Sequence, residues 1–164
     1  MKMQRTLVVS LLFSLSMLVL GSVAAAQSKG KYVCDEPNPQ SLCTADNTCP
    51  ASGPCTVDIK KTGMSGATAT PGFPKAKGNS LFCLKPGTTV IWQSTSKNTG
   101  FVIDFGPSSP FDPSDAIIGG ANKPVSVVAK RPGCFKYSAG ACVSGATYGM
   151  CGSGTAEAIV MGGH

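Results

Sequence analysis

Short runs of apolar and β-branched residues, separated by turns rich in Gly, Pro, Asn and Ser, recur along the chain from residue 56 onward. In the first run, Val57 and Ile59 alternate with polar residues, which is typical of a strand with one buried face. Beyond residue 26 no amphipathic pattern is long enough for an ordinary helix. We therefore predict strands over residues 56–60, 80–84, 88–93, 100–105, 125–130, 134–137 and 155–161.

The connections between these runs carry weaker signals. Residues 61–79 are rich in Gly, Thr, Pro and Lys, so we expect mainly a loop there, with a short edge strand as the alternative. After a Pro/Gly-rich loop, Ile117 and Ile118 are expected on a short helical turn that Ser114 caps. Short strands joined by turns predict an all-β protein, a β-sandwich of two packed antiparallel sheets. The candidates for its shared core are Trp92, Phe101, Val125, Val127 and Phe135.

The N-terminus has the order of a secretory signal. Lys2 and Arg5 precede an apolar run over residues 7–20, and small residues follow up to Ala26. The apolar run is shorter than the roughly 20 residues that a membrane-spanning helix needs. We predict that residues 1–26 are a cleaved signal peptide. The mature chain then begins at Gln27 and is secreted or periplasmic, with no stable membrane insertion.

Eight cysteines, an even number, all lie in the predicted mature chain. They are Cys34, Cys43, Cys49, Cys55, Cys83, Cys134, Cys142 and Cys151. In an oxidising compartment this predicts disulfides, although the sequence does not determine which cysteines pair. Structural zinc sites usually show closely spaced ligand pairs, but the chain has no Cys-x-x-Cys and its one histidine is His164. Cys83 and Cys134 lie in predicted strands and are candidates for a bridge between the two sheets.

Residues 27–55 differ from the rest of the mature chain. Four cysteines occur there among Pro, Asp, Asn and Gly, with almost no apolar side chains to build a core. Such a segment is ordered only by disulfides or by docking on another domain. We predict an irregular, disulfide-rich N-terminal lobe that is paired largely within itself, followed by the main domain over residues 56–164.

The charge is modestly basic. Lys2 and Arg5 leave with the signal peptide, so 12 of the 14 basic side chains remain against 8 acidic ones, a net charge of +4. The lysines are scattered along the chain, which favours a solvated surface over a nucleic-acid site. We expect the partner to be another protein or a cell-surface polymer, with attraction to anionic polymers left open.

Four stretches of the main domain resemble the cupredoxin family over about residues 80–161. They are Lys85-Pro-Gly-Thr-Thr-Val-Ile-Trp92, Gly100-Phe-Val-Ile-Asp-Phe105, Arg131-Pro-Gly-Cys-Phe-Lys-Tyr137, and Gly149-Met150 with the final strand. The resemblance implies a Greek-key β-sandwich. In copper-bearing members it also implies an electron-transfer site of two His, one Cys and a weak axial Met.

The ligand set of that family is incomplete here. Residues 98–101, where the first histidine would fall, read Asn-Thr-Gly-Phe, and no histidine lies between Cys142 and Met150. Cys142 and Met150 match the family's Cys and Met only loosely, and a disulfide between Cys142 and Cys151 would staple the same loop. We therefore predict no type 1 copper site and no cofactor. The alternative is a copper protein with an unusual ligand set of Cys142, Met150 and His164.

Catalytic residues are also lacking. With His164 as the one histidine, imidazole-based acid–base catalysis is excluded from the body of the domain, and paired cysteines are not nucleophiles. We predict a non-enzymatic, exported, disulfide-stabilised domain with a structural or binding role. Two alternatives remain open at this point: an atypical copper electron-transfer protein, and a disulfide-rich inhibitor or defence protein whose N-terminal lobe is the working part.

Overall fold

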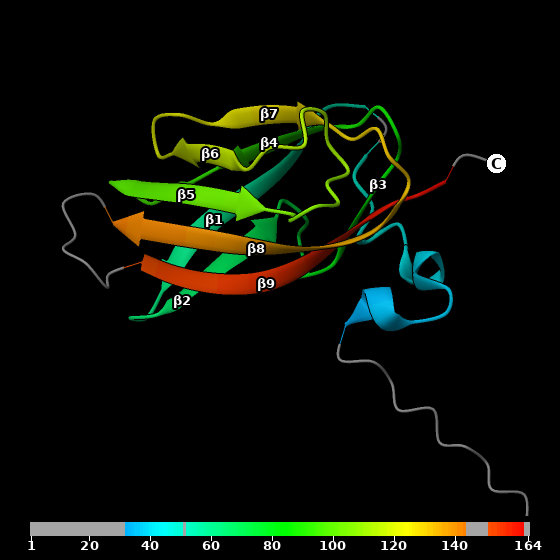
Figure 1. Ribbon diagram of the computed structural model, residues 1–164, viewed down its shortest axis with the longest axis horizontal. Helices are drawn as coiled ribbons and strands as arrows, with labels where there is room; N and C mark the ends of the chain where they lie inside the picture. Colours follow the sequence, from blue (N-terminus) through cyan, green and yellow to red (C-terminus); the bar gives the residue numbers. More distant parts are fainter. Residues whose placement is uncertain (1–31, 51, 144–150, 163–164) are drawn as a thin grey trace, which may run out of the picture.

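The chain is described by a computed structural model over residues 32–50, 52–143 and 151–162, and nearly all of its regular structure is strand (Figure 1). The strands are β1 (Cys55–Thr62), β2 (Gly66–Pro71), β3 (Phe82–Leu84), β4 (Thr89–Gln93), β5 (Thr99–Asp104), β6 (Ile117–Gly120), β7 (Val125–Val128), β8 (Gly133–Val143) and β9 (Cys151–Val160). Two single-turn 3-10 helices precede them, η1 (Val33–Asp35) and η2 (Pro39–Leu42). No helix within these ranges is long and apolar enough to cross a membrane.

The strands form one continuous sheet rather than the two separate antiparallel sheets that the sequence predicts. Its order is β6-β5-β8-β9-β2-β1-β4-β7, with β3 added on β9. The pairs β1–β4, β2–β9 and β3–β9 are parallel and the others antiparallel. The two end strands, β6 and β7, are joined by a tight turn in which Gly120 and Lys123 exchange backbone hydrogen bonds of 3.0 Å. The sheet therefore curls into a barrel-like closure, with β7 beside β6 in Figure 1.

Three local differences separate the observed strands from the predicted ones. Residues 117–120 form strand β6 and not a helical turn, because the edge of β5 offers a ladder on which Val102 pairs with Ile118. The alternation along β6 fits this pairing, since Ile117 is buried and Ile118 is exposed. Residues 61–79 contain a short strand, β2, but it lies between β9 and β1 and not at an edge, and β8 extends to Val143, well past the predicted end.

The core is built around an aromatic cluster. Trp92 is fully buried and makes edge contacts with Phe82, Phe111 and Tyr137, with ring centroids 5.5–6.2 Å apart. The predicted core residues Trp92 and Phe101 are buried, while Val125, Val127 and Phe135 are half-buried and pack against the cluster. Aromatic side chains bury large apolar areas, so this cluster contributes substantially to the stability of the core.

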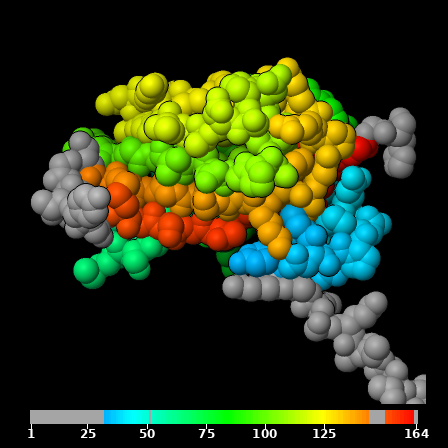
Figure 2. All heavy atoms as spheres, in the orientation of Figure 1, coloured from blue at the N-terminus to red at the C-terminus, as the bar shows by residue number. Residues whose placement is uncertain are grey.

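The N-terminal segment (residues 32–55) corrects the prediction of a lobe paired within itself. Cys34 bonds Cys134 on β8 and Cys43 bonds Cys83 on β3, so two of its three disulfides leave the segment, and Cys49 bonds Cys55, the first residue of β1. Cys83 and Cys134 consequently do not bridge two sheets. Figure 2 shows the segment, blue to cyan, packed against the barrel. With little apolar surface of its own, the segment gains order from these cross-links to the barrel.

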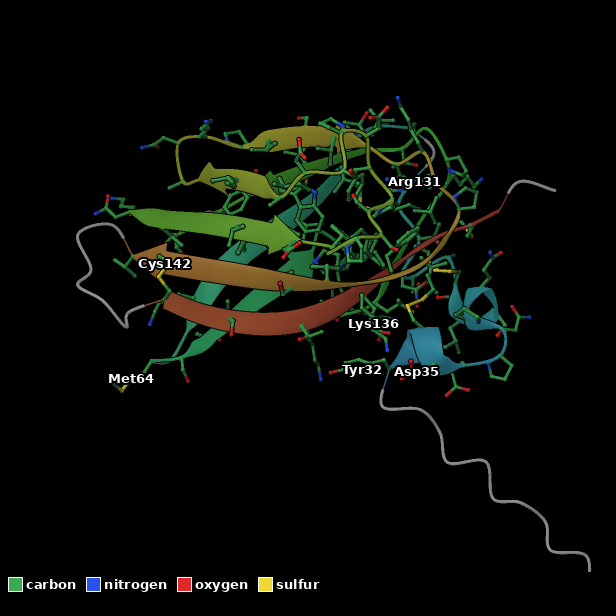
Figure 3. All side chains as sticks on the ribbon, viewed as in Figure 1. Tyr32, Asp35, Met64, Arg131, Lys136 and Cys142 are labelled. Carbon is green, nitrogen blue, oxygen red and sulfur yellow. A yellow bond between two sulfur atoms is a disulfide. The ribbon has the colours of Figure 1, made fainter. Side chains whose placement is uncertain are left out.

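Polar contacts hold the same segment in place. The backbone N–H groups of Val33 and Cys34 each donate a 2.9 Å hydrogen bond to the Glu157 carboxylate on β9. The Lys136 ammonium on β8 lies 2.6 Å from the Asp35 carboxylate and 4.4 Å from the centre of the Tyr32 ring. Figure 3 shows these three side chains converging beside the barrel. The N-terminal segment is thus an integral layer of the domain.

Candidate functional site

The place where the family resemblance would put copper lies where β5 begins and where β8 and β9 are linked. Gly100 on β5 is opposite Cys142 on β8, and Cys142 is in turn opposite Cys151 on β9. The Cys142 and Cys151 sulfurs are bonded, which is the pairing considered for this loop from the sequence, so Cys142 has no thiolate for a metal. Met150 and His164 lie outside the described residues. The residues present here do not fit a type 1 copper centre, because the described ranges contain no imidazole and the thiolate is consumed.

One other group of potential metal ligands exists among the described residues. The sulfurs of Cys34 and Cys134 and a carboxylate oxygen of Glu157 lie within 4.8 Å of one another. The two sulfurs form a disulfide, and the carboxylate accepts hydrogen bonds from Val33 and Cys34. This group therefore fixes the N-terminal segment and has no free ligand atoms for a cation.

A polar cleft of about 580 Å³ opens at the end of the barrel that lies away from the N-terminal segment. Two connections form its walls: the one between β4 and β5, and the tight turn between β6 and β7. The lining residues are Gln93, Ser94, Thr95, Lys97, Asn98, Ala121, Asn122 and Pro124. These residues, which we call the loop-end cleft, offer three carboxamides, two hydroxyls and one ammonium group.

Hydrogen bonds tie the two walls together and brace one of them. The Ala121 N–H donates to the Thr99 carbonyl at 3.0 Å, which ties the β6–β7 turn to the start of β5. On the other wall, the Thr95 N–H and hydroxyl donate to the two oxygens of Asp58 at 2.8 and 2.9 Å. Asn98 adopts a φ of 56°, a left-handed conformation that asparagine tolerates better than most residues. The cleft is therefore formed by a braced arrangement of two loops.

The loop-end cleft is electropositive. None of its eight lining residues is acidic, and no carboxylate of the described chain forms an ion pair with Lys97. The nearby Asp58 is already engaged by Thr95 and by the Lys60 ammonium at 3.0 Å. Ser94 is 4% exposed, and its hydroxyl has no hydrogen-bond partner within the described ranges. Unpaired donors and an unpaired cation leave this cleft with capacity to bind a polar ligand.

Two polar groups in the aromatic core are also unpartnered within the described part of the chain, the Trp92 Nε1–H and the Tyr137 hydroxyl. Burial raises the pKa of Tyr137 far above its ordinary value, because the low dielectric of the core disfavours the phenolate. The phenol therefore remains neutral and solvent-inaccessible, and it has no route to a substrate.

Sequence reasoning missed the loop-end cleft. Residues 94–98 look like an ordinary turn, and residues 121–124 look like the end of a loop. The signal that is visible in the sequence is the concentration of Asn, Gln, Ser, Thr and Lys without acid in both connections. No protein-family model matches the chain, and no curated protein matches it.

Proposed function

We propose that this chain is an exported, disulfide-stabilised binding domain that captures a polar ligand in the loop-end cleft. The observation that carries the proposal is the composition of that cleft: amide, hydroxyl and ammonium groups on braced loops, with no acid beside them. Such groups recognise a ligand through hydrogen bonds and charge, and fixed loops reduce the ordering cost of binding.

The cleft favours binding over catalysis. Neither of its two hydroxyls, on Ser94 and Thr95, is hydrogen-bonded to an imidazole or an amine within the described residues, so no nitrogen base activates them. The Thr95 hydroxyl donates to Asp58, whose oxygens also accept from a backbone N–H and from Lys60. That carboxylate is therefore occupied in bracing the loop. A domain of this kind acts without covalent chemistry and without a copper cofactor.

Export and a cupredoxin-like ancestry belong to the same proposal. Residues 1–26 resemble a signal that would direct the chain out of the cytoplasm. The four disulfides are bonds that persist in an oxidising compartment. The sequence stretches around Trp92, Phe101 and Tyr137 support descent from a Greek-key cupredoxin whose metal loop is closed by Cys142–Cys151. Copper loss then leaves the same end of the barrel available for a different ligand.

The test uses the full chain expressed with its own N-terminus in a secreting host. The mature protein should begin at Gln27, contain no free thiol, and give no intense visible thiolate-to-copper band when Cu(II) is added. Amide chemical shifts are then followed while cellotriose, trigalacturonate and a tripeptide are added separately. Clustered shifts at residues 93–98 and 121–124 with any one probe support the cleft as the binding site, whereas shifts confined to the N-terminal segment would move the function there.

A further inference from the structure

We propose that the ligand of the loop-end cleft is an acidic saccharide, whose anionic group pairs with Lys97 and whose hydroxyls bind the surrounding carboxamides. This inference rests on the proposed function, since it names the ligand class of the same cleft. The anionic group is a carboxylate or a sulfate ester, two forms of one chemistry that the experiment below separates.

The negative charge of the ligand is inferred from the charged residues at the cleft. Lys97 lines it, and Lys123 lies between two lining residues, Asn122 and Pro124. Neither ammonium forms an ion pair with a carboxylate of the described chain, unlike Lys60, Lys75, Lys130 and Lys136. Asp58, the acid next to the cleft, is saturated by Thr95 and Lys60. A cation-bearing cleft with no competing acid attracts anions and repels cationic ligands.

The remaining lining groups match a polyhydroxylated ligand. The carboxamides of Gln93, Asn98 and Asn122 each present a donor and an acceptor, which is the same pair of functions that each sugar hydroxyl offers. A volume of about 580 Å³ falls within the range of small-ligand sites and suits a short oligosaccharide.

Other anionic ligands fit these walls less well. The apolar lining consists of Ala121 and Pro124, which is too little to shelter an acyl chain or the aromatic anchor of a peptide. Single-stranded nucleic acid is usually held by aromatic side chains that stack on its bases, and no lining residue is aromatic. A saccharide needs neither feature if charge and hydrogen bonds hold it.

The lining of the loop-end cleft predicts weak binding of a single saccharide unit. Binding should be stronger to a polymer that repeats that unit. Lys97 is exposed, and exposed ion pairs contribute little and are screened by salt. Without an aromatic platform, the apolar face of a sugar gains no stacking. A polymer that presents many equivalent units raises the chance of rebinding and compensates for the low intrinsic affinity.

The experiment titrates the mature, fully disulfide-bonded protein with trigalacturonate, a sulfated trisaccharide and neutral maltotriose, each at low and high NaCl. Amide shifts at residues 93–98 and 121–124 report occupancy. We expect the acidic trisaccharides to bind, with an affinity that falls as salt rises, and maltotriose to bind more weakly. Preference for the galacturonate or the sulfated probe identifies which anionic group the cleft takes.

Three variants locate the contacts. Lys97→Gln should weaken binding of the acidic probe by about two- to fivefold and flatten its salt dependence. Asn122→Ala should weaken acidic and neutral probes alike. Lys85→Gln is the matched control, because Lys85 is also exposed but lies before the opposite end of β4, and it should change nothing.

Two results would overturn the inference while leaving the proposed function standing. One is maltotriose binding in the cleft as tightly as the acidic probes; the other is insensitivity of cleft binding to both Lys97→Gln and salt. Equal losses in Lys97→Gln and Lys85→Gln would show unspecific attraction to a basic surface and would also overturn it. If no probe shifts the cleft residues at all, both the inference and the function proposed for the cleft fail.

Discussion

The two ends of the barrel are built by different means. At the end where the N-terminal segment packs, which we call the stapled end, disulfides Cys34–Cys134, Cys43–Cys83 and Cys49–Cys55 act together with the Glu157 and Lys136 contacts. At the loop end, one disulfide, Cys142–Cys151, closes the β8–β9 pair, and the cleft walls are held by a few hydrogen bonds. In Figure 3, Cys142 and Lys136 mark the two regions.

The difference separates stability from recognition. Two of the three disulfides at the stapled end join residues 100 and 40 positions apart, so they restrict the unfolded state strongly, whereas Cys49 and Cys55 are 6 apart. The loop end carries short connections whose polar groups are left unpaired, as recognition of a ligand requires. A small domain has little stability to lose by leaving donors and a cation unpaired at its loop end. The disulfides at the stapled end offset that loss.

The largest loss of stability is expected in the core that both ends share. Trp92→Ala removes a fully buried side chain that contacts four other aromatic rings, and should lower the free energy of unfolding by about 3–5 kcal/mol. Urea unfolding followed by circular dichroism measures it. Ile118→Ala is the control, since Ile118 is 66% exposed and its loss should stay within about 0.5 kcal/mol. Similar values for both variants would contradict the core described here.

Removing one disulfide from each end tests the comparison directly. Cys34 and Cys134 are 100 residues apart and Cys142 and Cys151 are 9 apart. Replacing both partners by Ser should cost about 4 kcal/mol at the stapled end, where Cys43–Cys83 already shortens the loop, and about 2–3 kcal/mol at the loop end. Urea midpoints and slopes of the two double variants give both values. A greater loss in the Cys142/Cys151 variant would reverse the assignment of the stabilising end.

A feature of the fold can be predicted from the sequence when neighbouring residues determine it, and not when it depends on contacts with distant parts of the chain. The strands around Trp92 and Phe101 are predictable because β-branched and aromatic residues alternate there. The later half of β8, Ser138–Val143, consists mostly of small residues, and it is a strand only because β5 and β9 pair on either side of it. Likewise, Ile117 and Ile118 become a strand through the edge of β5, which no local pattern reveals.

Most of the disulfide pairing and the loop-end cleft also depend on contacts between distant parts of the chain. The Cys142–Cys151 bridge could be considered from the sequence because the two residues flank one short loop, whereas Cys34–Cys134 depends on where the N-terminal segment docks. The cleft needs residues 93–98 and 121–124 to meet, which follows from the closure of the barrel. Sequence patterns report the face of a strand; they do not report which two turns will become neighbours.

Acid titration sharpens the description of the stapled end. The hydrogen bond from Lys136 lowers the pKa of Asp35 below its ordinary value of 3.8, and Lys130 does the same for Asp112. Because each pKa is lowered on folding, its contribution to stability is full above the ordinary value and is lost as the pH falls through the lowered pKa. In carboxyl NMR titrations, Lys136→Gln should return Asp35 toward 3.8 and leave Asp112 unchanged. Lys130→Gln should do the reverse. A shift of both carboxyls in either variant would mean a rearrangement of the fold rather than loss of one pair.

The smallest effect is expected at two neighbouring lining residues of the cleft, Ser94 and Thr95, whose hydroxyls differ in their hydrogen-bond partners. The Ser94 hydroxyl is buried without a partner among the described residues, whereas the Thr95 hydroxyl donates to Asp58 at 2.9 Å. Ser94→Ala should therefore leave stability unchanged or raise it by up to about 1 kcal/mol, because a desolvated and unpaired group is removed.

Thr95→Ala should instead lower the free energy of unfolding by about 0.5–1.5 kcal/mol, since a hydrogen bond to a carboxylate is lost. Thermal and urea unfolding of both variants, at one pH, compare them directly. If Ser94→Ala is the more destabilising of the two, the Ser94 hydroxyl has a partner in solution, most simply an ordered water that bridges it to the cleft. A ligand entering the cleft would then have to displace that water or bind through it, and the affinity of every probe would change in Ser94→Ala.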